Sequence, residues 1–232
     1  MGTGARVFTA ADTGKVQAFC ELDPVVNLTL LARLSLQPIG TRGIQLYGYE
    51  DNGRLSSLCL VAGNIIISGS NDGLADYAYR YIAGRVSSLV GPAHIALELH
   101  RYLVRRGGLW AYPRNIRHSQ PLMVWKYDSQ VAPDPEVRKL TEAEYPSYLE
   151  ASVRMYTEEI GQNPLSYGLG YEDHVRQRLK GGAAYGVVRN GRVLFKADLG
   201  VSYRDHVQIQ GVWLDPLFRG RGLAAPAMTA VL

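Results

Sequence analysis

The segment that most constrains the fold of this chain runs from Gln208 to Leu232. Its sequence, QIQGVWLDPLFRGRGLAAPAMTAVL, predicts a strand around Val212, a stop at Asp215-Pro216, a glycine-containing turn and a helix of small residues. Gly220 and Gly222 lack side chains that would keep a ligand off the backbone, and the first N–H groups of a helix have no intrahelical partners. Because a helix N-terminus also carries partial positive charge, the segment predicts a site for an anion such as a diphosphate.

The turn resembles motif A of the GNAT acetyltransferases, (Arg/Gln)-x-x-Gly-x-(Gly/Ala), which Arg219, Gly222 and Ala224 match. A Walker loop and a Rossmann fingerprint both fit it badly, and a plain tight turn with a solvated charge pair is the alternative. The resemblance implies that the loop holds the diphosphate of acetyl-coenzyme A and that the preceding strand bonds its pantetheine arm. By position, the implied cofactor-binding residues are Val212, Trp213, Leu214, Arg219, Gly220, Arg221, Gly222, Leu223 and Ala224.

The predicted elements occur in a similar order in both halves of the chain. The first half is expected to contain a strand at 6–9, helices at 12–22 (capped by Asp12) and 25–34, strands at 44–49, 55–61 and 64–67, a helix at 74–83, a strand at 86–90, a helix at 92–104 and a strand at 121–125. The second half is expected to contain a strand at 137–140, a helix from the capping box at 141–144 to residue 160, a helix at 172–180, strands at 184–188 and 192–200, and the strand before the glycine turn.

Short sequence matches indicate that this order reflects a tandem duplication. YGYEDNGRL at 47–55 matches YGVVRNGRV at 185–193, and the Asn-Gly pair in each predicts a hairpin turn. Thr9-Ala-Ala-Asp12 corresponds to Thr141-Glu-Ala-Glu144. The predicted fold class is α/β (α+β), with tandem GNAT-like domains, each a mixed and mostly antiparallel sheet flanked by helices. The predicted boundaries are a degenerate domain at 1–126, a linker at 127–136 and an acetyltransferase domain at 137–232.

The two halves differ at the loop that follows the third strand, the one that comes after the hairpin. Where the second half has RGRGLA, the first has GSNDGLA with Asp72, and an acid there would repel a diphosphate. The first domain is therefore expected to lack the cofactor site. FKADLG at 195–200 and QIQGVWLDP at 208–216 resemble an actinobacterial two-domain GNAT group whose N-terminal domain has no known function. Compared with that family, the chain looks truncated after the motif A helix, where the tyrosine that usually protonates the leaving thiolate would lie.

Composition narrows the class of protein. Hydrophobic residues make up 47% and charged residues 20%, which is ordinary for a globular protein, and no apolar run has the length of a membrane span. The N-terminus lacks the form of a signal peptide, so a cytoplasmic location is expected. Cys20 and Cys59 lie among apolar neighbours and are expected to be buried free thiols. No metal-ligand spacing occurs, so no metal is expected.

The segment from Arg101 to Gln120 offers a different function, because it contains five arginines and no acidic residue. With Trp110 and Tyr112, this stretch would suit a polyanion, and residues 101–118 give a hypothesis of polyanion binding. No motif of a nucleic-acid-binding module accompanies it. A solvated helix end and loop is the simpler interpretation, and nucleic acid is not an expected partner.

The resemblance implies direct acetyl transfer from acetyl-coenzyme A to an amine, with a backbone N–H near Val212 as the oxyanion donor. The sequence leaves the general base and acid unidentified, and Glu158, Glu159 and Gln210 are the candidates to contact the acceptor amine. The acceptor is a small molecule, a peptide or a protein. A non-catalytic acyl-CoA-binding or regulatory module is the alternative function. The sheet edge of a truncated domain also predicts a homodimer.

Overall fold

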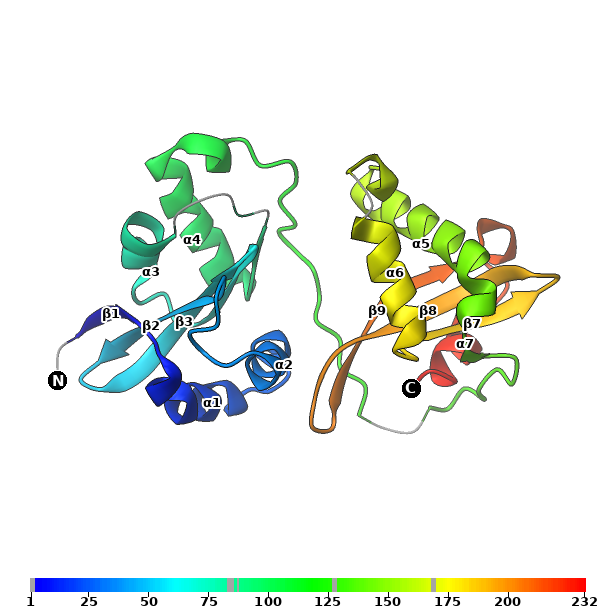
Figure 1. Ribbon diagram of the computed structural model, residues 1–232, viewed down its shortest axis with the longest axis horizontal. Helices are drawn as coiled ribbons and strands as arrows, with labels where there is room; N and C mark the ends of the chain where they lie inside the picture. The colour runs from blue at the N-terminus through cyan, green and yellow to red at the C-terminus, as the bar shows by residue number, and fades with distance from the viewer. Residues whose placement is uncertain (1–2, 83–85, 87, 127–128, 168–169) are drawn as a thin grey trace. The chain divides into compact units, whose positions relative to one another are not determined.

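The computed structural model describes residues 3–82, 86, 88–126, 129–167 and 170–232. The chain divides into two compact units, residues 1–124 with 201–206 and residues 125–200 with 207–232. In each unit helices cover both faces of a sheet (Figure 1). The predicted fold class, α/β (α+β), is confirmed. The predicted domain boundaries remain a prediction.

In the first unit the sheet order is β1-β2-β3-β4-β5, antiparallel except for the parallel pair of β4 and β5. Its elements are β1 (Gly4–Val7), α1 (Thr13–Glu21), α2 (Leu28–Leu36), β2 (Gln45–Asp51), β3 (Arg54–Ala62), β4 (Asn64–Gly69), α3 (Leu74–Asp76), β5 (Leu89–Val90) and α4 (Ala93–Arg106). One core lies between the sheet and the helices α1 and α2, and a second lies between the sheet and the segment formed by α3, a π-helical turn and α4.

In the second unit the order is β6-β7-β8-β9. Its elements are β6 (Arg138–Lys139), α5 (Tyr145–Ile160), α6 (Gly170–Lys180), β7 (Ala184–Arg189), β8 (Arg192–Tyr203), β9 (His206–Leu214) and α7 (Ala224–Thr229). Helices α5 and α6 cover one face of this sheet and α7 covers the other (Figure 1), and a buried apolar cluster lies on each side.

The hairpins of the two units have the same turn geometry and a bulge at the same position. In each, an Asn-Gly pair forms the turn with both residues at positive φ, 50° and 83° for Asn52 and Gly53, 51° and 73° for Asn190 and Gly191. This is the type I′ geometry that favours this dipeptide. Each hairpin also has a bulge three residues before its Asn, after Tyr49 in the first unit and after Val187 in the second. The turn prediction is confirmed, and the shared bulge is what a duplication predicts.

The matched Tyr-Gly pairs have a packing explanation. A Cβ on Gly48 would lie 2.3 Å from the ring of Phe8, and a Cβ on Gly186 would lie 2.4 Å from the Phe195 carbonyl and 3.2 Å from Leu140. Phe8 and Leu140 each follow the first strand of their unit and are buried against the hairpin. Glycine is therefore required at both positions by close approach of the neighbouring atoms.

The start of the first helix is also the same in both units. Thr141 and Glu144 form the predicted capping box, in which Glu144 accepts from the Thr141 N–H at 2.8 Å and from Arg138 at 2.8 Å. In the first unit Asp12 accepts from the Thr9 N–H at 2.8 Å and pairs with Arg6. Asp12 occupies the N-cap position of α1, as predicted, but its side chain makes no capping bond to that helix. Its carboxylate turns back to Thr9 as the third residue of a box that Thr9 opens.

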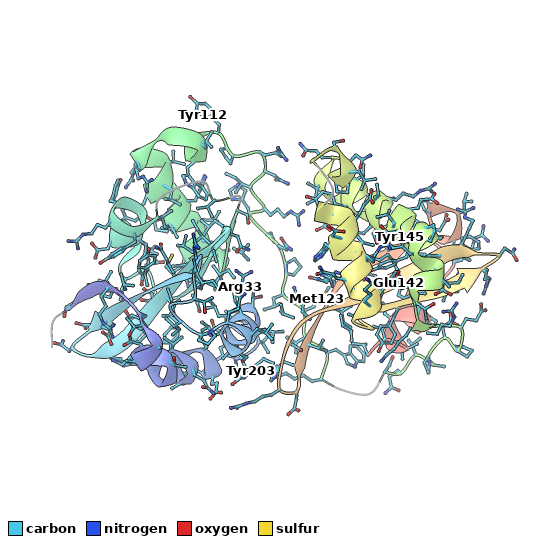
Figure 2. All side chains as sticks on the ribbon, viewed as in Figure 1. Arg33, Tyr112, Met123, Glu142, Tyr145 and Tyr203 are labelled. Carbon is cyan, nitrogen blue, oxygen red and sulfur yellow. The ribbon has the colours of Figure 1, made fainter. Side chains whose placement is uncertain are left out.

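The predicted strand at residues 121–125 is also wrong. The described residues there form no strand, and Leu122 and Met123 are 63% and 86% exposed. Figure 2 labels Met123 in this segment. An apolar run forms a strand only where a sheet offers both a hydrogen-bonding edge and a face to cover. The linker predicted at 127–136 falls partly on residues 127 and 128, which lie outside the described residues.

The capping boxes give a pH-dependent prediction. Hydrogen bonds from Arg138 and from Thr141 hold the pKa of Glu144 at about 2, below its ordinary value of 4.5. Because the folded pKa is the lower one, the stabilisation is complete above pH 4.5 and is lost as the pH falls towards 2. Glu144→Gln should therefore lower the free energy of unfolding by about 1 kcal/mol at pH 7 and by almost nothing near pH 2. Urea denaturation at both pH values measures this.

Glu142→Gln is the matched control, since Glu142 lies in the same turn but outside the box, 3.9 Å from Arg176. Glu142 is labelled with Tyr145 in Figure 2, at the start of α5. An equal effect of the two substitutions at pH 7 would contradict the assignment of the stabilisation to the capping box.

Candidate functional site

The strand β9 ends at a buried carboxylate. Asp215 is 1% exposed; its Oδ1 accepts from the Leu217 N–H at 3.0 Å and its Oδ2 accepts from Arg192 Nη2 at 2.8 Å. The first bond caps a 3-10 turn at Pro216–Phe218, and the second joins this turn to the start of β8. Asp215 therefore fixes the point at which the chain leaves the sheet, as the Asp-Pro pair predicts.

The loop after this turn has the predicted open backbone. Gly220 and Gly222 have φ values of 73° and 77°, and a Cβ on either would meet no atom within 4 Å. Leu223 occupies the N-cap of α7 and supplies no side-chain cap to the first N–H groups of that helix. The predicted order of strand, glycine turn and small-residue helix is confirmed, and the loop presents backbone that a ligand can approach.

The two arginines of the loop have different contacts. Arg219 Nε donates to the Leu214 carbonyl at 2.8 Å, and its Nη2 forms an ion pair with Glu158 Oε2 at 2.7 Å. Arg221 lies over the Phe218 ring, 5.6 Å from its centroid, and is exposed. Arg219 thus ties the loop to the strand and to the end of α5, whereas Arg221 extends the positive charge of the loop towards solvent.

A groove of about 430 Å³ lies between the end of α5 and the end of β9. Its lining residues are Met155, Glu158, Glu159, Val212, Trp213, Leu214 and Arg219. The groove is shallow and open to solvent, and its walls combine apolar side chains with a few charges. The structure therefore brings together the strand, the loop arginine and the helix glutamates that the sequence suggested separately.

The charges in this groove are coupled through Glu158. Its Oε2 pairs with Arg219, and its Oε1 accepts from Trp213 Nε1 at 3.3 Å. These contacts, that from Arg219 first, lower the pKa of Glu158 below its ordinary value. The side chains of Glu158 and Arg219 are each 45% exposed, so the pair contributes little to stability. Its main effect is to join the end of α5 to the glycine loop beside the groove.

The third candidate for contact with an acceptor, Gln210, lies elsewhere. It is not among the lining residues of the groove, and with its amide oxygen turned to Arg178 it accepts from Nη1 at 3.0 Å. Arg178 in turn donates to the Leu199 carbonyl at 3.1 Å. Gln210 therefore belongs to a polar contact between β9 and α6, whereas Glu158 and Glu159 lie in the groove.

A buried polar cluster beside β9 was not predicted from the sequence. Lys196 is fully buried and pairs with Asp198 at 2.7 Å, while Tyr148 donates to Asp198 at 2.8 Å. Charged residues are almost never fully buried unless paired. The available signal was the alternation of Lys and Asp within the apolar strand VLFKADLG, at positions where the first half has Leu58 and Leu60.

In the first unit, the corresponding loop between β4 and α3 is held by hydrogen bonds within the unit. Ser70 Oγ donates to Asp72 Oδ2 at 2.7 Å, and Ser57 Oγ donates to the Asp72 carbonyl at 2.6 Å. The Asp72 side chain is exposed and acidic, where the second unit has an arginine-bearing loop. These contacts support the expectation that the first unit lacks a diphosphate site.

The basic segment after residue 100 is partly used in packing. Arg106 donates to the carbonyls of Ala78 and Ile82, and Arg101 pairs with Glu98 at 2.5 Å. Arg105 lies over the Tyr102 ring, 5.7 Å from its centroid. Contacts within the unit therefore engage these three arginines, which weakens the polyanion hypothesis.

Among the described residues, no helix combines the length and the apolar character needed to cross a bilayer. No three His, Cys, Asp or Glu side chains of the described residues are grouped so that they could hold a metal ion. Cys20 and Cys59 are buried free thiols, as predicted.

The role of Asp215 is testable. Asp215→Ala removes the cap on Leu217 and the partner of Arg192, and it should lower the free energy of unfolding of the second unit by about 2 kcal/mol. Guanidinium denaturation followed by circular dichroism measures the change. Asp205→Ala, at an exposed turn position, is the control and should change it by less than about 0.5 kcal/mol. Equal effects at the two positions would contradict the role given to Asp215.

Comparison with known proteins gives a family match and a structural similarity. Residues 44–148 match a family described as a domain of unknown function, DUF4081. Among solved structures, the chain is similar to an acetyltransferase from the GNAT family of Colwellia psychrerythraea, with 10% sequence identity and a TM-score of 0.48 over 97% of this chain and 82% of that chain. No curated protein matches the chain. The family match runs from β2 to the first turn of α5, so the case for a function rests on the geometry of the groove.

Proposed function

We propose that the second unit binds acetyl-coenzyme A and transfers its acetyl group to an amine, as a GNAT-type N-acetyltransferase. One observation carries the proposal: the end of β9, the arginine of the glycine loop and the acidic end of α5 line a single groove. A thioester bound along β9 with its diphosphate at the loop would have its reactive carbonyl beside a helix that carries carboxylates.

The residues present fit such a ligand. Backbone groups of Val212, Trp213 and Leu214 would bond the pantetheine arm. Backbone N–H groups from Gly220 to Ala224, including those of Gly222 and Leu223, would bind the diphosphate, with Arg219 and Arg221 adding positive charge. The open space around both glycines supports this assignment.

The proposed reaction needs a neutral amine, an oxyanion donor and a proton acceptor. The amine nitrogen attacks the thioester carbonyl, a C–N bond forms, and the C–S bond breaks to release coenzyme A as its thiolate. A backbone N–H near Val212 would stabilise the developing oxyanion. Glu158 and Glu159, which line the groove, would attract a cationic amine and receive its proton directly or through water.

The lowered pKa of Glu158 favours the alternative function, a non-catalytic acyl-CoA-binding module. A carboxylate held in its charged form by Arg219 is a weak base. This observation favours a non-catalytic acyl-CoA-binding module, in which the same loop and strand bind the ligand without transfer. Both functions require the groove, and turnover separates them.

The proposed acceptor is an amine carried by a small molecule, a peptide or a protein. The negative charge at the groove favours an acceptor that is cationic before it loses a proton. The first unit, which lacks the arginine loop, would serve as a scaffold.

Acetyl-coenzyme A binding tests the proposal. Gly222→Glu places a carboxylate where the diphosphate is expected, and it should weaken binding at least 100-fold in titration calorimetry, because like charges repel at this distance. Gly182→Glu is the matched control: Gly182 also has a positive φ, 64°, and open space around its Cβ position, but it lies between α6 and β7. The control should carry similar backbone strain and bind normally, and equal losses in both variants would contradict a diphosphate site at the loop.

Release of free thiol then separates the enzyme from the binding module. The chain is incubated with acetyl-coenzyme A and a panel of primary amines, and thiol formation is followed. Amine-dependent release that Gly222→Glu abolishes supports the enzyme. Tight binding with no amine-dependent release supports the non-catalytic module, and absence of binding by the unmodified chain would overturn both.

A further inference from the structure

The buried ion pair under β9 has a third partner in the backbone. Lys196 Nζ donates to the Gly211 carbonyl at 2.9 Å while it pairs with Asp198 at 2.7 Å. The Lys196 ammonium also lies 5.1 Å from the centre of the Tyr148 ring. Both hydrogen bonds and the cation–π contact therefore hold one ammonium at a fixed place beneath Gly211.

Gly211 has a conformation that only glycine adopts easily. Its φ is 58° in the middle of a strand, and a Cβ there would lie 2.6 Å from Asp198 Oδ2. Both the positive φ and the close carboxylate therefore exclude a side chain. The Asp198 carboxylate and the Gly211 backbone fit against each other directly.

The side chains of β9 change faces at this glycine. In a regular strand Ile209 and Trp213, four residues apart, would lie on the same face. Instead Ile209 packs with Phe195 and Ala227 on the α7 side, and Trp213 packs with Tyr148 on the α5 and α6 side. A one-residue shift, as in a β-bulge, thus occurs between them, at Gly211. The shift is what places the Trp213 indole beside Glu158 in the groove.

The first unit shows that the shared fold does not need these charges. With the hairpins aligned on their Asn-Gly turns, Lys196 and Asp198 correspond to Leu58 and Leu60, which are fully buried. With the capping boxes aligned, Tyr148 corresponds to Val16, also fully buried. All three apolar residues belong to one core cluster. In β4, the strand that pairs with β3, φ is negative from Asn64 to Ser68 and becomes positive, at 98°, only at the last residue, Gly69.

We propose that Lys196 and Asp198 are positioning residues that fix the bulge at Gly211 and so build the groove for acyl-coenzyme A. This inference rests on the proposed function for the identity of the ligand, but the link from the ion pair to Trp213 stands on the geometry alone. The pair acts through β9, by setting which residues of the strand face the groove.

The test replaces the pair by its counterpart in the first unit. The full 232-residue chain carrying Lys196→Leu and Asp198→Leu should still fold, with a thermal midpoint that falls only slightly. Removal of the buried charges is often neutral or stabilising, but the Tyr148 hydroxyl and the Gly211 carbonyl each lose a hydrogen-bond partner. Its affinity for acetyl-coenzyme A should fall at least tenfold. The indole N–H resonance of Trp213 in a ¹⁵N–¹H spectrum, assigned with Trp213→Phe, should shift. Leu58→Met with Leu60→Met is the control and should alter neither readout.

The outcomes are distinct. A double variant that folds with an unshifted Trp213 resonance and an affinity within twofold of normal overturns the inference. A double variant that does not fold also overturns it, because the pair would then serve the fold itself. Tyr148→Phe, which removes only the hydroxyl bonded to Asp198, should shift the Trp213 resonance in the same direction by less, and no shift counts against the inference. If the unmodified chain does not bind acetyl-coenzyme A, the proposed function fails, and the Trp213 resonance still decides the role of the pair.

Discussion

The burial of a charged pair under β9 is the constraint that sets the path of this strand. Removing an ammonium and a carboxylate from water costs several kcal/mol for each ion, and good hydrogen-bond geometry is needed to recover it. Here Tyr148 and the Gly211 carbonyl supply that geometry. Moving β9 out of place would therefore strand both charges, so the path of this strand, and with it the position of Trp213, is narrowly defined.

Local sequence patterns predicted the parts of the fold that depend on local chemistry. The Asn-Gly turns, the Thr141–Glu144 box and the Asp215-Pro216 stop each depend on residues close in sequence, and all three are confirmed. Residues 121–125 failed because a strand needs a distant partner that the pattern does not reveal. The pairing of Glu158 with Arg219, 61 residues apart, was equally invisible. The end of α5 was predicted at residue 160, but a local pattern does not show where that end lies relative to β9.

The two units show how one frame holds different surfaces. The two units share an arginine in the first strand, the capping box, the bulged hairpin and the close-packed glycine. All of these lie away from the loop that follows β4 in one unit and β9 in the other. At that loop, Asp72 with its serines in one unit contrasts with Arg219 and two open glycines in the other. The same frame therefore carries two loops of different charge and backbone geometry.

The difference between Leu58-Leu60 and Lys196-Asp198 also bears on how such a chain folds. Two similar hairpins in one polypeptide invite strand exchange between neighbours, a common failure of repeat proteins. A β8 strand that took the place of β3 would bring two charges against Val16 with no tyrosine hydroxyl to meet them. A β3 strand in the place of β8 would leave Tyr148 without an acceptor. The divergence of these few core positions thus makes each hairpin specific for its own helices.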